Sequence, residues 1–168
     1  LTHSKPESET QNNSNTIQIL CVGRIHPRKG QDQILLSLQK LPQDIQKNLV
    51  VRFLGPNIKP NYLRKIKKIQ NHFLGKVLFM GDCSEDELKE AYSKADIFAL
   101  TSIPKKMSVE GFGFVYLEAS SHGLPIVANR IGGVEDAVIH EETGLLSSPH
   151  ALQTLSENFK RLISDKSL

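Results

Sequence analysis

The chain has 168 residues, which is the size of one ordinary domain and excludes a second complete lobe. Its 21 lysines and arginines exceed its 18 aspartates and glutamates by only three, so charge alone does not predict a nucleic-acid-binding protein. Cys21 and Cys83 lie far apart, indicate neither a disulfide framework nor a structural zinc site, and fit a reducing cytosol.

The ends of the sequence and its apolar runs indicate one soluble domain. No apolar run approaches the roughly 20 residues of a membrane-spanning helix, and the start lacks a signal-peptide pattern. Residues 1–15 are polar and rich in serine and asparagine, as in a flexible linker. We therefore expect a linker over 1–15, a domain over 16–168, and a chain excised from a longer protein.

Short apolar runs alternate with stretches of helical spacing from residue 16 onward. Strands are expected at 16–23, 49–55, 76–81, 95–102, 124–129 and 144–146. Between them, residues 34–41, 62–73, 88–95, 114–122 and 152–162 form the apolar faces of expected helices. This alternation predicts an α/β fold of three layers, in which a Rossmann-like parallel sheet of about six strands is covered by helices on both faces.

Several helix boundaries have sequence signals. The first helix is expected to stop at Pro42, and Ser84 with Glu87 forms a capping box. Gly123 is expected in the left-handed conformation that ends a helix, whereas Ser148 and Pro149 are expected to open the last helix.

The 62–73 helix carries four basic residues on the side away from its apolar stripe. We interpret this side as a solvated face and keep contact with anionic lipid as an alternative. The four residues are Arg64, Lys65, Lys67 and Lys68.

The loop after the first strand, residues 23–30, concentrates cations where ligands of such folds bind, beyond the carboxyl ends of strands. It lacks the further glycines of a dinucleotide fingerprint and the GxxxxGK[ST] string of a P-loop. Arg24, Arg28 and Lys29 lie just before a helix N-terminus, where guanidinium and ammonium groups could hold a diphosphate. The alternative is a turn with ordinary surface basic residues.

The loop after the fourth strand combines glycines with two glutamates. Gly111 and Gly113 precede an expected helix whose first N–H groups could approach an anion. Glu110 and Glu118 would repel phosphate but could accept hydrogen bonds from sugar hydroxyls. Glu118 lies one turn inside the helix among apolar neighbours, where a buried carboxylate needs a partner. For Glu110 the alternative role is a carboxylate that interacts with the helix dipole.

Other residue patterns give weaker signals. Gly132 and Gly133 could expose backbone N–H groups after the fifth strand, although a tight turn explains them equally well. The six histidines are scattered, which makes a metal site unexpected, and Ser120 and Ser121 lack the GxSxG pattern of a hydrolase.

Three strings, VGRIHPRKG, EGFGFVYLEASSHGLPIVAN and GGVEDAVIHEETGLL, resemble the carboxyl-terminal lobe of retaining glycosyltransferases of family 4, which have the GT-B fold. The resemblance covers residues 17–163, and its strongest element is a Glu-x7-Glu signature formed by Glu110 and Glu118. Such enzymes have two Rossmann-like lobes, of which the second binds a nucleotide-sugar donor and the first binds most of the acceptor.

The resemblance implies a role for each matching position. Arg24 and Lys29 would contact the donor diphosphate, Glu118 the ribose hydroxyls and Glu110 the transferred sugar. The implied catalytic residues are Arg24, Lys29 and Glu110. The implied donor-binding residues are Gly23, Arg24 and Lys29, then Gly81, Asp82 and Cys83 beside the base, then Glu110, Gly111, Phe112, Gly113, Phe114, Val115 and Glu118.

The implied activity is transfer of a hexosyl group, with retention, from a UDP- or GDP-sugar to a saccharide or lipid-linked acceptor in polysaccharide biosynthesis. No cofactor, catalytic metal or nucleic-acid partner is expected. We expect the first lobe and a final crossover helix to be absent, so that the fragment binds donor without turnover. The expected location is cytoplasmic, with peripheral contact at the inner face of the membrane left open. Alternatives are another GT-B enzyme, such as a sugar-nucleotide epimerase or a phosphorylase, and an inert nucleotide-sugar-binding module.

Overall fold

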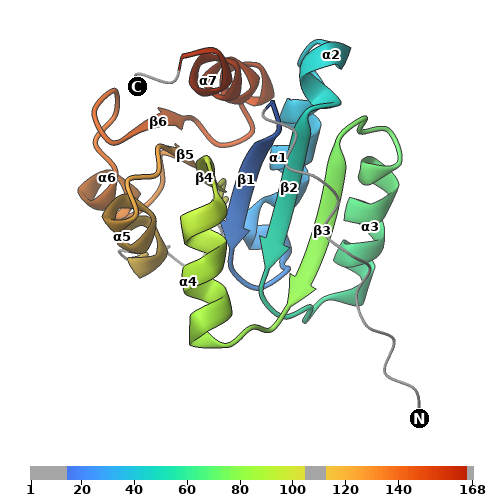
Figure 1. Ribbon diagram of the computed structural model, residues 1–168, viewed down its shortest axis with the longest axis horizontal. Coiled ribbons are helices and arrows are strands. Elements are labelled where there is room, and N and C mark those ends of the chain that lie inside the picture. The colour runs from blue at the N-terminus through green and yellow to red at the C-terminus, as the bar shows by residue number, and fades with distance from the viewer. Residues whose placement is uncertain (1–14, 105–112, 166–168) are drawn as a thin grey trace.

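The computed structural model describes residues 15–104 and 113–165. At its centre lies one six-stranded sheet in which every adjacent pair of strands is parallel, in the order β3-β2-β1-β4-β5-β6 (Figure 1). The strands are β1 (Ile17–Val22), β2 (Leu49–Leu54), β3 (Lys76–Gly81), β4 (Ile97–Leu100), β5 (Ile126–Asn129) and β6 (Gly144–Ser147). The predicted parallel sheet of about six strands is confirmed.

Helices cover both faces of the sheet. On one face α1 contacts both α3 and α7, whereas α4 lies on the other face, in front of the sheet in Figure 1, with α5 and α6 beside it. The helices are α1 (Gln31–Leu38), α2 (Gln43–Gln46), α3 (Pro60–Gln70), α4 (Glu85–Lys94), α5 (Phe114–Ser121), α6 (Val134–Ala137) and α7 (Leu152–Ser164), with a 3-10 turn η1 (Pro27–Lys29). The predicted three layers are therefore confirmed.

The core is formed by the sheet and the inner sides of the helices. All four residues of β4 and of β5 are buried, because helices cover both of their faces. Ile34, Leu35 and Leu38 of α1 are also fully buried. The sheet thus provides a rigid base for the loops that follow its strands.

Two local boundary predictions are confirmed by geometry. The Ser84 hydroxyl accepts from the backbone N–H of Glu87, and the Glu87 carboxylate accepts from the backbone N–H of Ser84. The Glu87 carboxylate also accepts from the Ser84 hydroxyl, and the two hydrogen bonds that it accepts from Ser84 lower the pKa of Glu87. Gly123 follows α5 with a φ of 69°, as expected for the left-handed residue at a helix end.

The predicted start of the last helix is wrong. Ser148 and Pro149 form a turn, and α7 begins only at Leu152. The reason is His150, whose φ of 65° is incompatible with a continuous helix. Gln33 in α1 holds His150 in place, because its Nε2 lies 2.8 Å from His150 Nδ1 and its Oε1 accepts from the His150 backbone N–H.

Two other helices end earlier than predicted. α1 ends at Leu38 rather than at Pro42, because the N–H groups of Lys40 and Leu41 donate to carbonyls three residues back and tighten the chain into a turn. α3 ends at Gln70, and Phe73 is buried in the turn after it. The apolar spacing predicted which side chains are buried but not where the backbone leaves the helix.

At Gly30 the loop after β1 approaches the backbone at the end of β4 very closely. It has a φ of 68°, and a Cβ placed on it would lie 2.0 Å from the carbonyl oxygen of Thr101 at the end of β4. Only glycine allows this approach, because any side chain would overlap that carbonyl. The loop after β1 therefore packs directly against the end of β4.

We expect Gly30→Ala to lower the free energy of unfolding by about 3–5 kcal/mol, the combined cost of left-handed strain and of a clash with backbone. Gly123→Ala is the matched control, because its φ is 69° but nothing lies within 4 Å of the added Cβ. The control loses about 1–2 kcal/mol from strain alone. Urea unfolding of both variants measures the difference, and equal losses would refute the close contact at Gly30.

Candidate functional site

The site lies where the order of strands reverses direction. β1 and β4 are neighbours at the centre of the sheet, but the chain leaves β1 toward α1 on one face and leaves β4 toward α5 on the other. Loops that diverge in this way leave a crevice beyond the carboxyl ends of the two strands, and ligands of open parallel sheets bind there. Both loops that were singled out from the sequence begin at this point.

Lys29 lies over the carboxyl end of β1. Its side-chain carbons come within 3.8 Å of the position that a Cβ on Gly23 would occupy. Burial raises the pKa of the Cys21 thiol in β1 to about 12, and the positive charge of Lys29 opposes that rise. The structure therefore brings together Gly23 and Lys29, two of the predicted donor-site residues.

Arg24 is exposed, but the backbone around it is fixed. The Gln31 side chain donates from Nε2 to the Arg24 carbonyl oxygen over 2.9 Å, and the backbone N–H of Ile25 donates to the Pro56 carbonyl oxygen. Gln31 is fully buried, and its Oε1 has no hydrogen-bond partner. Sequence reasoning missed Gln31, for which the available signal is a polar residue at the start of a helix that packs on the sheet.

His26 and Arg28 belong to the local structure of the turn. His26 Nδ1 accepts from the backbone N–H of Arg28 over 3.1 Å and caps η1. The Arg28 carbonyl oxygen accepts from the backbone N–H of Ile103, which attaches η1 to the segment after β4. The loop after β1 therefore contacts the end of β4 and the segment after it at two places. One is the hydrogen bond between Ile103 and Arg28, and the other is the close approach of Gly30 to Thr101.

A chain of buried hydrogen bonds extends this attachment across the sheet. The Thr101 hydroxyl donates to the Gly30 carbonyl oxygen over 2.8 Å. Asn129, at the end of β5, donates from Nδ2 to the carbonyl oxygens of Thr101 and Ser102, and its Oδ1 accepts from the Ser147 hydroxyl of β6. We call Gly30, Thr101, Asn129 and Ser147 the edge relay. It fixes the ends of β4, β5 and β6 relative to the loop that carries Arg24 and Lys29.

The second predicted loop leads into α5. Gly113, with a φ of 63°, is the N-cap, and no side chain caps the first turn. The N-terminus of a helix carries a partial positive charge and favours an anion. Phe114 is 75% exposed and Leu117 is 40% exposed, so this end of α5 presents apolar side chains to its surroundings. The predicted residues Glu110, Gly111 and Phe112 lie outside the described residues.

Glu118 has the partner that the sequence analysis required, although the residue is exposed rather than buried. The Tyr92 hydroxyl of α4 donates to Glu118 Oε2 over 2.8 Å. Tyr92 is buried between the rings of His122 and Phe98, at centroid distances of 5.0 and 6.0 Å. Burial and then the Glu118 carboxylate raise the pKa of Tyr92, so this residue remains a hydrogen-bond donor. Tyr92 thereby orients Glu118.

Gly81 is the last residue of β3, and Asp82 and Cys83 follow it, two strands away from β1. Gly81 has a φ of 69°, and its carbonyl oxygen accepts from the backbone N–H of Gly55. Burial and the charges of Glu87 and Asp82 raise the pKa of the Cys83 thiol, which keeps this thiol protonated. The proposed contact of this loop with a base stays a prediction.

The described residues form neither a metal-binding cluster nor a membrane-spanning helix. Among residues 15–104 and 113–165, no group of three or more His, Cys, Asp and Glu could hold a metal ion. Within the same residues, no helix is both long and apolar enough to span a bilayer. The expectation that catalysis needs no metal stays a prediction.

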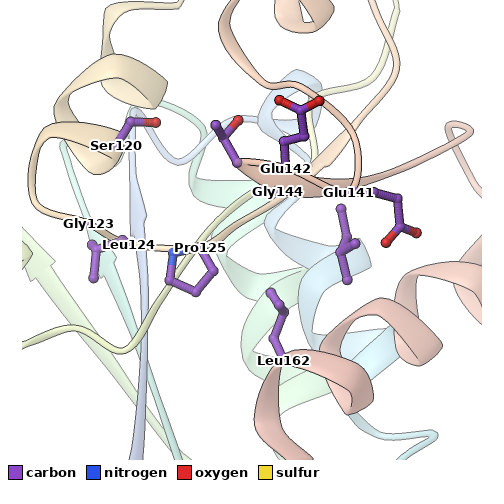
Figure 2. A pocket seen from close by; sticks show the side chains of 10 residues that line it. Ser120, Gly123, Leu124, Pro125, Glu141, Glu142, Gly144 and Leu162 are labelled. Carbon is purple, nitrogen blue, oxygen red and sulfur yellow. The ribbon is translucent and has the colours of Figure 1, made fainter. Parts of the chain in front are cut away.

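A pocket of about 250 Å³ lies at the amino ends of β5 and β6, on the side of the sheet opposite to the two loops (Figure 2). Leu124, Pro125 and Leu162 line it between the end of α5, the turn before β6 and α7, together with the carboxylate-bearing Glu141 and Glu142. The pair Arg161 and Glu141 forms two hydrogen bonds of 2.7 Å beside it. Because the pocket is at the amino ends of β5 and β6, it is not part of the crevice described above.

Comparison with known proteins identifies the family. Residues 4–168 match the family model described as glycosyl transferases group 1, and the chain therefore belongs to this family. A GDP-mannose-dependent phosphatidylinositol monomannoside mannosyltransferase of Mycobacterium tuberculosis is 32% identical over 154 residues, which cover 88% of this chain and 38% of that protein. A sulfoquinovosyl transferase of Arabidopsis thaliana is 30% identical over an alignment that covers 88% of this chain and 27% of that protein.

Solved structures of similar proteins have the same fold as this chain. Anabaena HepE in complex with UDP and glucose superposes with a TM-score of 0.79 at 25% identity, over 91% of this chain and 40% of that one. Sucrose-phosphate synthase of Thermosynechococcus elongatus superposes with a TM-score of 0.77 at 28% identity, over 92% and 38%. The chain thus spans well under half the length of these relatives and has the fold of a GT-B lobe.

We expect Asn129→Ala to lower the free energy of unfolding by about 3 kcal/mol or more, because it leaves two carbonyl oxygens and the Ser147 hydroxyl buried without partners. Asn158→Ala is the matched control. Asn158 is also buried, but its Nδ2 has no hydrogen-bond partner to lose. The control therefore loses less than about 1 kcal/mol in urea unfolding, and equal losses would show that the edge relay does not stabilise the fold.

Proposed function

We propose that the chain is the donor-binding lobe of a retaining glycosyltransferase, which transfers a hexosyl group from a UDP- or GDP-sugar to a saccharide or lipid-linked acceptor. One observation carries the proposal. Lys29 lies over the end of β1, and the next residue, Gly30, joins its loop to β4, the strand from which the chain leads to the N-terminus of α5. Two sources of positive charge thus belong to the loops that bound one crevice.

The proposed chemistry uses this charge where it is needed. As the bond from the anomeric carbon of the sugar to the donor phosphate breaks, negative charge accumulates on the leaving diphosphate. Arg24, Lys29 and the first turn of α5 would stabilise that charge more in the transition state than in the ground state. The acceptor hydroxyl would form the new bond on the same face of the sugar, and its proton would pass to an oxygen of the leaving phosphate.

The two glutamates would bind opposite ends of the donor. Tyr92 holds Glu118 through a hydrogen bond, which supports its role as an acceptor from the ribose hydroxyls. Glu110 would bind hydroxyls of the transferred sugar. Relatives support both nucleotides, since the HepE complex contains UDP and the Mycobacterium tuberculosis relative is named as GDP-mannose-dependent.

The acceptor would be bound mainly by another part of the full-length enzyme. Phe114 and Leu117 support this assignment, because exposed apolar side chains at the edge of a crevice are suited to a contact with a second lobe. Relatives from Mycobacterium tuberculosis, Mycolicibacterium smegmatis and Corynebacterium glutamicum are named as phosphatidylinositol monomannoside mannosyltransferases, which are names with a lipid-linked acceptor. We propose a cytoplasmic location for the full-length enzyme, with peripheral contact at the membrane, and the lipid in these relatives' names supports the membrane contact.

Calorimetry of the chain with free nucleotide and with the nucleotide sugar tests the proposal. Glu118→Ala should weaken the affinity for UDP or GDP about ten- to a hundredfold, because a hydrogen-bonded carboxylate is removed. Glu110→Ala should weaken only the affinity for the sugar-linked form, and Glu157→Ala, an exposed glutamate of α7, should change neither.

Equal losses for free nucleotide in the Glu110 and Glu118 variants would contradict the assignment of the two carboxylates. An absence of heat with every nucleotide sugar would contradict donor binding itself.

A further inference from the structure

The positive charge of the chain is concentrated in one segment. Residues 47–81 contain eight lysines and arginines and no aspartate or glutamate, whereas the remaining residues have 13 basic and 18 acidic side chains. Although the net charge of the chain is small, its positive and negative charges are therefore distributed very unevenly along the sequence. The segment comprises β2, α3 and β3, which form one end of the sheet and its flanking helix (Figure 1).

Within this segment the outer side of α3 is the centre of the charge. Tyr62 and Ile66 of the helix are buried, which fixes the side that faces the core. At 3.6 residues per turn, Arg64, Lys67 and Lys68 project from the opposite side, and all three are exposed. We call these three residues the α3 basic face. Lys65 is not part of it, because it forms a 2.6 Å ion pair with Asp32.

The α3 basic face is costly for the helix itself. Arg64 and Lys68 are four residues apart, and Arg64 and Lys67 three apart, so like charges are neighbours and repel one another. By contrast, the lysines of α4 are compensated, since Lys89 pairs with Glu85 and Lys94 with Glu90 at spacing i, i+4. The helix dipole favours Lys67 and Lys68 in the last turn but not Lys59 at the N-cap. Helix stability alone therefore does not explain this charge pattern.

We propose that the α3 basic face is the surface by which this lobe adheres to an anionic lipid bilayer. Clusters of lysine and arginine on one helix face attract negatively charged headgroups. Ile58 and Leu74, at the two ends of α3, are 41% and 46% exposed and provide apolar side chains for the interfacial region. Phe79 of β3 is partly buried, and Lys67 Nζ lies 6.0 Å from its ring centroid, so this ring does not provide the open stacking face with which proteins hold single-stranded nucleic acids.

The contact would be electrostatic and shallow. Because Tyr62 and Ile66 already pack in the core, the apolar side of α3 is not available for insertion into lipid. Adhesion should therefore weaken steeply with added salt. The inference rests on the proposed peripheral location of the enzyme but not on donor binding, since none of the three basic residues belongs to the donor site.

Sedimentation with vesicles tests the inference. We expect the chain to bind vesicles of phosphatidylcholine with phosphatidylglycerol at low salt and not vesicles of phosphatidylcholine alone. The variant Arg64→Gln, Lys67→Gln, Lys68→Gln should lower the partition coefficient about a hundredfold, at about fivefold for each charge near the surface. The control Lys40→Gln, Lys89→Gln, Lys160→Gln removes the same charge from other exposed positions and should bind almost as the unmodified chain does.

Thermal unfolding and calorimetry with nucleotide complete the experiment. Both triple variants should keep the fold and the nucleotide affinity of the unmodified chain, which separates a failure of this inference from a failure of donor binding. Equal loss of vesicle binding in the two variants, binding that is insensitive to salt, or binding of RNA in place of vesicles would overturn the inference.

Discussion

The close approach of Gly30 to the end of β4 is the constraint on which the candidate site depends. A carbonyl oxygen of Thr101 occupies the space that a side chain at residue 30 would need, and the Thr101 hydroxyl donates to the Gly30 carbonyl oxygen. The contact joins two loops that the topology sends to opposite faces of the sheet. Together with the hydrogen bond from the Ile103 N–H to the Arg28 carbonyl oxygen, it fixes the backbone of Lys29 relative to β4.

The site therefore has a buried floor and an exposed surface. The floor is polar and mostly paired. Asn129 donates to the carbonyl oxygens of Thr101 and Ser102 and accepts from the Ser147 hydroxyl, whereas Gln31 Oε1 and the Ser102 hydroxyl have no hydrogen-bond partner among the described residues. Above it, Arg24 and Glu118 are exposed, and each is held through one buried neighbour, Gln31 or Tyr92. Such an arrangement positions charged groups without burying them, which avoids the free-energy cost of desolvating charges before a ligand arrives.

Much of this could be predicted from the sequence, because the signals were local. The alternation of apolar runs and helical spacing predicted the three layers, and the capping box at Ser84 and the left-handed Gly123 were read from a few adjacent residues. The missed features depend on contacts between residues far apart in the chain. Gln33 holds His150 across 117 positions, and Tyr92 reaches Glu118 across 26, neither of which has a signature in its own segment.

A crystal structure of the chain with a bound UDP- or GDP-sugar would show where the donor binds relative to β1 and β4. We predict electron density for the diphosphate between the ammonium group of Lys29 and the first turn of α5, with the ribose beside Glu118. Density for the nucleotide at the amino ends of β5 and β6, in the pocket of Figure 2, with the β1 loop unoccupied, would contradict it.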